Sequence, residues 1–385
     1  MLCLSARTAF DALLTTRSFP KGSHVIMSGE SPPNAVFPLF NGLLLHISPA
    51  INIPDMVTIV QAHGLVPVPI DLDFDSLSPD AAQFKAAVDD ERSVCAVVAH
   101  VFGCIVDMTP YVELCRQKPG FLLVEDAAEA FCPELMRIPV LCSVRLYSFG
   151  PIKVCTSWTG AVAVVRDGEQ CAALRRQLSS YPLQTRWSHL LRVLKFFFLV
   201  LLQHPTVFYL LVKALKTLGF DHAAVLQPLV KSFSAKQSLL DNIRKQPCAA
   251  AAQTLALRIS QVDTEMLRES RARALQVGPL LPPSCRVPGS KAQLHTYWLY
   301  PVVIQDTALR RRVCDMFRAS AMFDVGTKPS QLCVIPPPEG STLAQPKISQ
   351  MIMSNCIFVP CRRGVPKSVC DLLVRTIVRA DLQPY

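Results

Sequence analysis

The sequence predicts an α/β protein with a mostly parallel sheet in a large domain, followed by a smaller α+β domain. Between residues 55 and 165, short apolar runs alternate with helical stretches, and the alternation returns after Trp298. The runs are apolar on both faces, which is typical of a parallel sheet covered by helices on both sides. We expect a large domain over residues 1–170, a basic apolar helical segment over 171–240, and a helix leading into the small domain over 241–385.

Strand ends give the first candidates for a site. The expected strands of the large domain are 66–71, 94–100, 121–126, 144–149 and 161–165, with helices at 79–90 and 110–116. Ser78 is a suitable N-cap for the first of these helices, and Pro79 suits its first position. A helical stretch over 242–273, strands at 298–304 and 357–359, and helices at 309–321 and 366–380 follow. Because such sheets bind ligands at the carboxyl ends of their strands, His100, Asp126 and Ser148 are candidates.

Composition excludes several classes of protein. The chain has 385 residues, of which 50% are hydrophobic and 18% charged, so it is not a disordered chain. Its fifteen cysteines show no framework of spacings and no accompanying histidine cluster, so we expect a reduced, cytoplasmic protein without a metal site. We see no cleavable signal peptide at the start. The net charge is +10. A nucleic-acid-binding surface would typically alternate aromatic and basic residues across a sheet, and the sequence has no such motif, so we expect no nucleic-acid partner.

Lys153 and Asp126 form the most informative pair in the chain. Each follows an apolar run, so an amine and a carboxylate could point into one pocket. Pyridoxal 5'-phosphate (PLP) needs this pair, because a lysine holds its aldehyde and a carboxylate holds its ring nitrogen. The Ser148 hydroxyl is placed to bind the phosphate. Each residue also has a purely structural interpretation. The lysine could be a solvated surface residue, Asp126 a helix N-cap, Ser148 a turn residue, and His100 a hydrogen-bonded histidine without a catalytic role.

Four motifs carry a resemblance to a known family. Glu125-Asp126-Ala127-Ala128-Glu129 and the segment Ser148 to Lys153 resemble the E-D-A-A-Q and S-F-x-x-x-K motifs of the DegT/StrS family of PLP-dependent aminotransferases. His100-Val101-Phe102-Gly103 and His295-Thr296-Tyr297-Trp298 are similar to its H-x-Y-G and H-x-Y-H motifs. The resemblance implies the PLP-dependent transferase type I fold and a homodimer in which the partner completes each site.

The same resemblance implies roles for individual residues. Lys153 would be the Schiff-base lysine, Asp126 the partner of the ring nitrogen, and Ser148 a phosphate ligand. Glu129 and His100 would line the pocket. The amino donor would be glutamate and the acceptor a sugar-like keto compound, or a lipid-linked one if the chain works at a membrane.

Three positions depart from the family pattern. Ala6-Arg7 stands where the family has the Gly-Thr of its first phosphate loop, and Ile53 stands where an aromatic residue stacks on the ring. Asn242 matches the partner subunit's phosphate-contacting asparagine. These departures leave two alternatives: an impaired aminotransferase-fold protein that acts as a membrane-surface or interaction module, and another PLP reaction such as a lyase. Lys153 speaks against the family's dehydratase branch, which has histidine there.

Residues 29–49 interrupt the family pattern. Removing these twenty-one residues joins Ser28 directly to Ala50, and the pattern then runs without a gap. We interpret the segment as a translated non-coding insert or a gene-model error. The alternative is a genuine surface loop, but the apolar content of the segment argues against this alternative.

A basic apolar segment suggests a membrane surface. Residues 171–220 contain seven Lys and Arg side chains and no Asp or Glu. Within them, the apolar run 196–212 is shorter than the ~20 residues needed to span a bilayer, and Pro205 lies near its middle. One hypothesis is an interfacial helix pair broken at Pro205, with the basic side chains of 175–216 on an anionic membrane. The other, with equal weight, is a helical hairpin buried at the dimer interface.

Overall fold

A computed structural model describes residues 1–28, 54–151, 153–201, 213–214, 217, 238–320, 345–359, 361 and 367–382. Ile53, the interrupting segment 29–49 and most of the apolar run 196–212 lie outside the described residues. Within the described ranges, no helix combines the length and the apolar character needed to cross a membrane.

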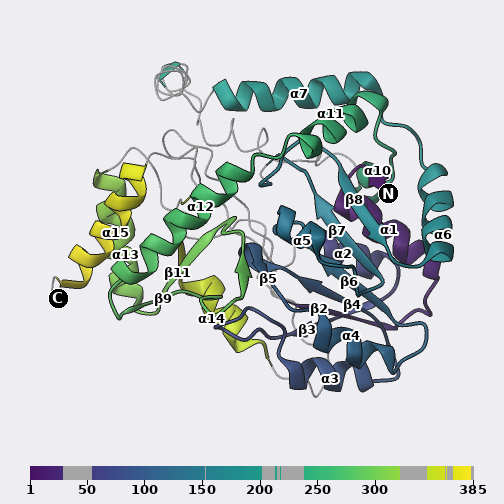
Figure 1. The fold of residues 1–385 in the computed structure, drawn as a ribbon, viewed down its shortest axis with the longest axis horizontal. Coiled ribbons are helices and arrows are strands. Elements are labelled where there is room, and N and C mark those ends of the chain that lie inside the picture. The colour runs from purple at the N-terminus through teal and green to yellow at the C-terminus, as the bar shows by residue number, and fades with distance from the viewer. Residues whose placement is uncertain are drawn as a thin grey trace.

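A seven-stranded sheet forms the centre of the large domain (Figure 1). Its strands, in spatial order, are β1 (Leu2–Cys3), β8 (Ala161–Val165), β7 (Val144–Ser148), β6 (Leu122–Asp126), β4 (Ser93–Ala99), β2 (His24–Ser28) and β3 (Val66–Ile70). The five strands from β7 to β3 are parallel, whereas β8 is antiparallel to both β7 and β1. This confirms the α/β class with a mostly parallel sheet. It also makes β1 run in the same direction as β7, so both strands end at the same edge.

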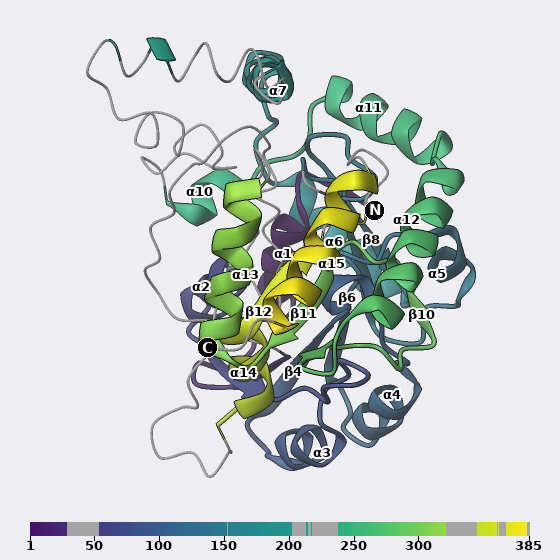
Figure 2. The same cartoon turned by 90° about the vertical axis from the view of Figure 1, so that its left-hand side faces the viewer.

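Helices cover both faces of this sheet (Figures 1 and 2). They are α1 (Ala6–Arg17), α2 (Pro54–Ala62), α3 (Ala81–Asp89), α4 (Thr109–Arg116), α5 (Pro133–Arg137) and α6 (Gly168–Ser179). Successive strand residues serve opposite faces: Val97 packs in the core beneath α1, α2 and α6, while Val98 packs in the core beneath α3 and α4. This two-sided burial explains why the strands are apolar runs without alternation.

The start of α3 corrects one expectation. The helix begins at Ala81 with Asp80 as its N-cap, whose carboxylate accepts the Gln83 N–H at 2.8 Å, and not with Ser78 and Pro79. Pro79 instead forms a bridge with Leu72, and the Ser78 carbonyl accepts a hydrogen bond from Asp73 N–H. The segment before the helix is therefore held against the chain that follows β3.

The C-terminal part has its own sheet and core. The sheet is antiparallel, in the order β12 (Cys356–Val359), β11 (Tyr300–Ile304), β9 (Cys285–Arg286), and a two-stranded pair joins β10 (Leu294–His295) to β5 (Cys104–Ile105). The described helices after α6 are α7 (Arg186–Leu201), α10 (Leu239–Ile243), α11 (Ala249–Ser260), α12 (Thr264–Val277), α13 (Thr307–Ser320), α14 (Lys347–Asn355) and α15 (Lys367–Leu382). Two short 3-10 turns occur as well: Val101–Gly103 follows β4, and Gly278–Leu280 follows α12. α12, α13 and α15 pack against β11 and β12.

Three boundaries in this part differ from the expectation. The helical stretch 242–273 is divided into separate helices, and Asp263 caps the N-terminus of α12 by accepting the Met266 N–H at 2.8 Å. Trp298 precedes β11 instead of belonging to it, because Tyr297 has a positive φ of 49° that bends the chain just before the strand. α14 has no counterpart among the expected elements.

Candidate active site

The carboxyl ends of β4, β6 and β7 place the predicted residues along one edge of the sheet. β4 and β6 are paired in register, with Ala99 opposite Asp126, and the backbone N–H of His100 donates to the Asp126 carbonyl at 3.0 Å. Ser148 ends β7, which is the next strand along. His100, Asp126 and Ser148 are therefore close neighbours, as parallel pairing requires.

Asp126 is placed to pair with a cation. Its carboxylate accepts the Ala128 N–H at 3.0 Å, but residues 127–130 form a turn, so the helix that a capping role would require is absent here. Burial raises the pKa of the Asp126 carboxyl, and the opposing effects of the Ala128 N–H, Lys153 and His100 do not cancel this rise. A positively charged partner at this carboxylate would restore its ionised form.

Lys153 lies between a carboxylate and an indole ring. Its Nζ atom is 3.7 Å from Oε1 of Glu129 and 4.7 Å from the centre of the Trp298 ring. Glu129 is held in place because its other oxygen accepts the Phe102 N–H at 3.0 Å. Glu129 and Trp298 are both buried, whereas 13% of the Lys153 side chain is exposed. The Lys153 side chain is thus largely but not completely enclosed.

Gly103 lets three segments meet behind the amine. Its φ is +88°, and a Cβ added there would lie 2.1 Å from Oγ1 of Thr296, 3.1 Å from the Trp298 nitrogen and 3.2 Å from the Glu129 carbonyl. Thr296 N–H donates to the Gly103 carbonyl at 2.8 Å, and its hydroxyl donates to the Glu129 carbonyl at 3.3 Å. The close approach fixes Glu129 and Trp298 relative to Lys153.

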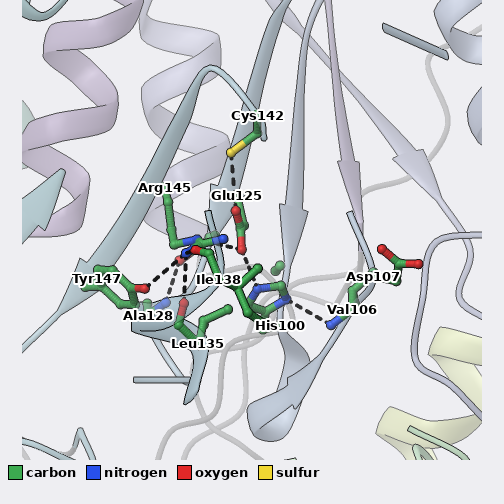
Figure 3. Close-up of polar contacts among 12 residues, drawn as sticks. His100, Val106, Asp107, Glu125, Ala128, Leu135, Ile138, Cys142, Arg145 and Tyr147 are labelled. Atoms are coloured by element: carbon green, nitrogen blue, oxygen red, sulfur yellow. Dashed lines mark hydrogen bonds and ion pairs between the residues drawn. The ribbon is translucent and has the colours of Figure 1, made fainter. Parts of the chain in front are cut away.

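A buried charged network supports the site from behind (Figure 3). His100 donates through Nε2 to Glu125 at 3.0 Å, since its Nδ1 accepts the Val106 N–H at 3.2 Å. Arg145 pairs with the same carboxylate at 2.8 Å, and the Cys142 thiol donates to its other oxygen at 3.2 Å. Burial alone would raise the pKa of Glu125, but His100 and Arg145 outweigh it and lower the pKa. His100 is therefore anchored in this network, and its ring does not open into solvent.

Sequence reasoning missed Arg145 and the role of Glu125. The signal was present, because Arg145 occurs within an otherwise apolar strand, and a charged residue is rarely buried without a partner. Glu125 was recognised only as the first residue of the family motif, and its buried pairing with Arg145 was not predicted.

The remaining predicted residues lie elsewhere or outside the described ranges. The side chain of Ser148 makes no hydrogen bond within the part of the chain that the structure describes. Asn242 lies on α10, where its amide donates to the Ser238 carbonyl at 3.1 Å. Because Asn242 is expected to act in the partner subunit's site, the single chain does not test it. Ile53 is not among the described residues.

Comparison with solved structures identifies the fold. DesV from S. venezuelae matches with a TM-score of 0.64 at 17% identity, covering 100% of this chain and 85% of that one. A putative sugar aminotransferase from Streptococcus pneumoniae, in its PMP form, matches with a TM-score of 0.65 at 12% identity over 99% of this chain and 85% of that one. At these identities the likeness establishes the fold.

Sequence comparison finds relatives that match part of the chain. GDP-perosamine synthase from Caulobacter vibrioides is 28% identical over 130 residues, which is 32% of this chain and 34% of that protein. L-glutamine:2-deoxy-scyllo-inosose aminotransferase from Streptomyces paromomycinus is 32% identical over 106 residues, which is 27% of this chain and 24% of that protein. The alignments thus span between 24% and 34% of the length of these relatives.

The model of the DegT/DnrJ/EryC1/StrS aminotransferase family matches residues 47–192. This range contains Lys153, Asp126, Ser148, Glu129 and His100. Over this region, the chain is similar to the DegT/DnrJ/EryC1/StrS aminotransferase family.

Proposed function

We propose that the protein is a PLP-dependent aminotransferase that moves an amino group from glutamate to the keto group of a sugar-like or lipid-linked acceptor. The observation that carries this proposal is the convergence of a largely buried amine, Lys153, and a strand-end carboxylate, Asp126, whose pKa is already affected by Lys153. Neither side chain is needed to build the sheet. Both belong to the region that matches the aminotransferase family.

The side chains present fit PLP. Asp126 has a raised pKa and would hold the protonated ring nitrogen, which in turn would stabilise the carboxylate. Ser148 has a hydroxyl with no hydrogen bond among the described residues and would bind the phosphate. A related solved structure, from Bacillus subtilis, contains bound PMP. When bound, the cofactor supplies an electron sink for the substrate carbon next to the transferred nitrogen.

Lys153 then has two tasks. Its Nζ atom would hold the aldehyde of the cofactor, and the same amine would carry a proton to and from the substrate carbon. Glu129, at 3.7 Å from Nζ, positions the amine. Trp298 limits the directions that Nζ can take, because the indole ring lies 4.7 Å away. His100 supports the chain next to Asp126 from the buried network.

The substrate class rests on relatives. Those named above are a GDP-perosamine synthase and an aminotransferase acting on 2-deoxy-scyllo-inosose. A cyclic, hydroxylated keto compound is therefore the acceptor that we propose, with glutamate as the donor that the family resemblance implies. The identity of the acceptor depends on pocket residues and not on the fold.

Spectroscopy tests the activity. Purified protein mixed with PLP should develop a visible absorption band that borohydride removes, and mass spectrometry should then find the label on Lys153. Lys153→Ala should lose both signals, and Lys85→Ala, an exposed lysine on α3, serves as the matched control. Absence of the band in the wild-type protein would refute the proposal. A band without transamination of any keto sugar would favour the impaired alternative, a membrane-surface or interaction module.

The surface of α7 supports a membrane-associated, cytoplasmic homodimer as the finer proposal. Six apolar side chains, at spacings of three and four residues, form one stripe of this helix and are between 43% and 65% exposed: Trp187, Leu190, Leu191, Leu194, Phe197 and Phe198. An outward apolar stripe on a helix within a strongly basic segment is typical of an interfacial helix. The described cysteines are all free thiols, which fits a reducing compartment.

Vesicle flotation separates the two uses of α7. The protein should float with vesicles containing anionic lipid, and less with neutral vesicles. Leu191→Gln combined with Leu194→Gln should abolish flotation and leave the dimer intact by light scattering. Loss of the dimer without any flotation in the wild type would instead assign this face to the subunit interface.

The domain division stays a proposal as well. The seven-stranded sheet lies within residues 1–170 and the three-stranded sheet within 241–385. We propose that residues 29–49, within the large domain, are a translated non-coding insert or a gene-model error that interrupts the family pattern. Sequencing the mature transcript tests this, since an uninterrupted message that contains the segment would contradict it.

A further inference from the structure

The first turn of α1 shares an edge of the sheet with Ser148. β1 and β7 run in the same direction, and the hydrogen bonds after their ends form a chain: Phe149 N–H donates to the Gly160 carbonyl, and Gly160 N–H donates to the Leu4 carbonyl, both at 2.9 Å. The backbone just after β7 and the backbone just before α1 are therefore linked through a single intervening residue, Gly160.

Two arginines reach this edge from different helices. Arg7 lies in the first turn of α1, where its guanidinium contacts the Asp55 carboxylate at 2.9 Å. Arg192, on α7, donates to the Thr159 hydroxyl at 3.2 Å, and that buried hydroxyl donates onward to the Leu4 carbonyl at 3.2 Å. The Arg192 head group thus lies beside the residue that precedes the N-cap of α1.

The electrostatics of this pair favour an anion. Burial lowers the pKa of Arg192, and the nearby positive charge of Arg7 lowers it further. Burial also lowers the pKa of Arg7, which Asp55 only partly offsets. Two partly buried guanidinium groups of like charge gain from an anion near them, and arginine matches the oxygens of a phosphate through paired hydrogen bonds.

We propose that Arg7 and Arg192 bind a phosphate monoester at the edge that carries Ser148, and that this group is the 5'-phosphate of the cofactor. The inference rests on the proposed function. It explains how Arg7 can stand where the family has a small residue and a hydroxyl: a side-chain cation replaces the donors that those residues would offer. It also gives α7 a role at the site in addition to its outward apolar stripe.

Paired binding measurements test the proposal. Equilibrium dialysis gives the dissociation constants of PLP and of pyridoxal, which lacks the phosphate, for the wild type, Arg7→Gln and Arg192→Gln. Each variant should bind PLP about 10- to 100-fold more weakly, the size of one lost charge-assisted contact, with pyridoxal binding changed less than about threefold. Arg192→Lys keeps the charge and should recover part of the loss. Arg186→Gln, an exposed position on the same helix, is the control and should behave as wild type.

The outcomes separate the possible explanations. Equal losses for PLP and pyridoxal would mean that the arginines only support the fold, which overturns the inference, and unchanged binding of both would do the same. Weaker binding of a phosphorylated sugar together with unchanged PLP binding would place the phosphate on the acceptor instead, and would overturn the assignment to the cofactor. If the wild type binds PLP and the variants match it, this inference fails alone, whereas a wild type that binds no PLP refutes the proposed function.

Discussion

Replacing Arg145 with methionine should cost more stability than replacing Arg145 and Glu125 together. Glu125 is 1% exposed and Arg145 3% exposed, with 2.8 Å between Nε and Oε1. Removing the arginine leaves a buried carboxylate whose remaining donors are the His100 ring and the Cys142 thiol. It also removes the donors to the backbone carbonyls of Leu135 and Ile138. An uncompensated buried charge of this kind costs about 3–5 kcal/mol.

The double variant Glu125→Leu with Arg145→Met removes the stranded charge. It should recover part of the loss, because the unpaired carbonyls and the buried His100 and Cys142 donors then remain, at a cost of about 1–3 kcal/mol, which is smaller than that of the unpaired charge. Urea unfolding followed by far-ultraviolet circular dichroism gives the free energy of unfolding of both variants and the wild type. An Arg145→Met cost below about 1 kcal/mol, or a double variant less stable than the single one, would refute the reasoning.

Further predictions concern positions outside this network. Gly103→Ala should lower the free energy of unfolding by about 2–4 kcal/mol, measured by urea unfolding, because its Cβ would meet Oγ1 of Thr296 at 2.1 Å and its φ is +88°; a loss below about 1 kcal/mol would contradict this. Hydrogen bonds from His63, Arg244 and Tyr181 overcome the effect of burial and hold the pKa of Asp11 well below its usual range, so its contribution is present near neutral pH and lost as the pH falls below about 4. Thermal melts of Asp11→Asn should therefore show a flatter loss of stability between pH 5 and 2 than the wild type, and identical slopes would count against this assignment. Asp71→Ala should cost about 1–3 kcal/mol in the same urea assay, because the Asp71 carboxylate accepts hydrogen bonds from the first turn of α14; an unchanged free energy of unfolding would contradict the capping role.

The large domain was predictable because its strands are buried on both faces. Continuous apolar runs bounded by helices leave few alternatives to a parallel sheet, and β8 has the same bounds as expected, Ala161–Val165. Its antiparallel direction was not predictable, since apolar content does not encode strand direction. The start of α3 moved from Pro79 to Ala81 because tertiary contacts of Ser78 and Pro79 outweighed the local capping preference.

The candidate site likewise contains residues that the sequence predicts and contacts that it does not predict. His100, Asp126 and Ser148 were found because strand ends can be located in the sequence. The contacts of Arg192 with Thr159 and of Lys153 with Trp298 join residues far apart in the chain, and no local pattern indicates such pairs. The buried pairing of Glu125 with Arg145 is of the same kind, although a charge within an apolar strand signals that some partner exists.

The pairing of β1 with β8 has a consequence for synthesis on the ribosome. Leu2 and Cys3 pair with Val162 and Ala161, so the first strand has no partner until most of the large domain has been translated. Closing so long a loop is entropically slow compared with forming neighbouring pairs. In the nascent chain, the apolar first strand and the start of α1 therefore stay unpaired and exposed, and chaperones that bind apolar segments can bind them. The edge that we assign to phosphate binding would then be the last part of the large-domain sheet to be completed during biosynthesis.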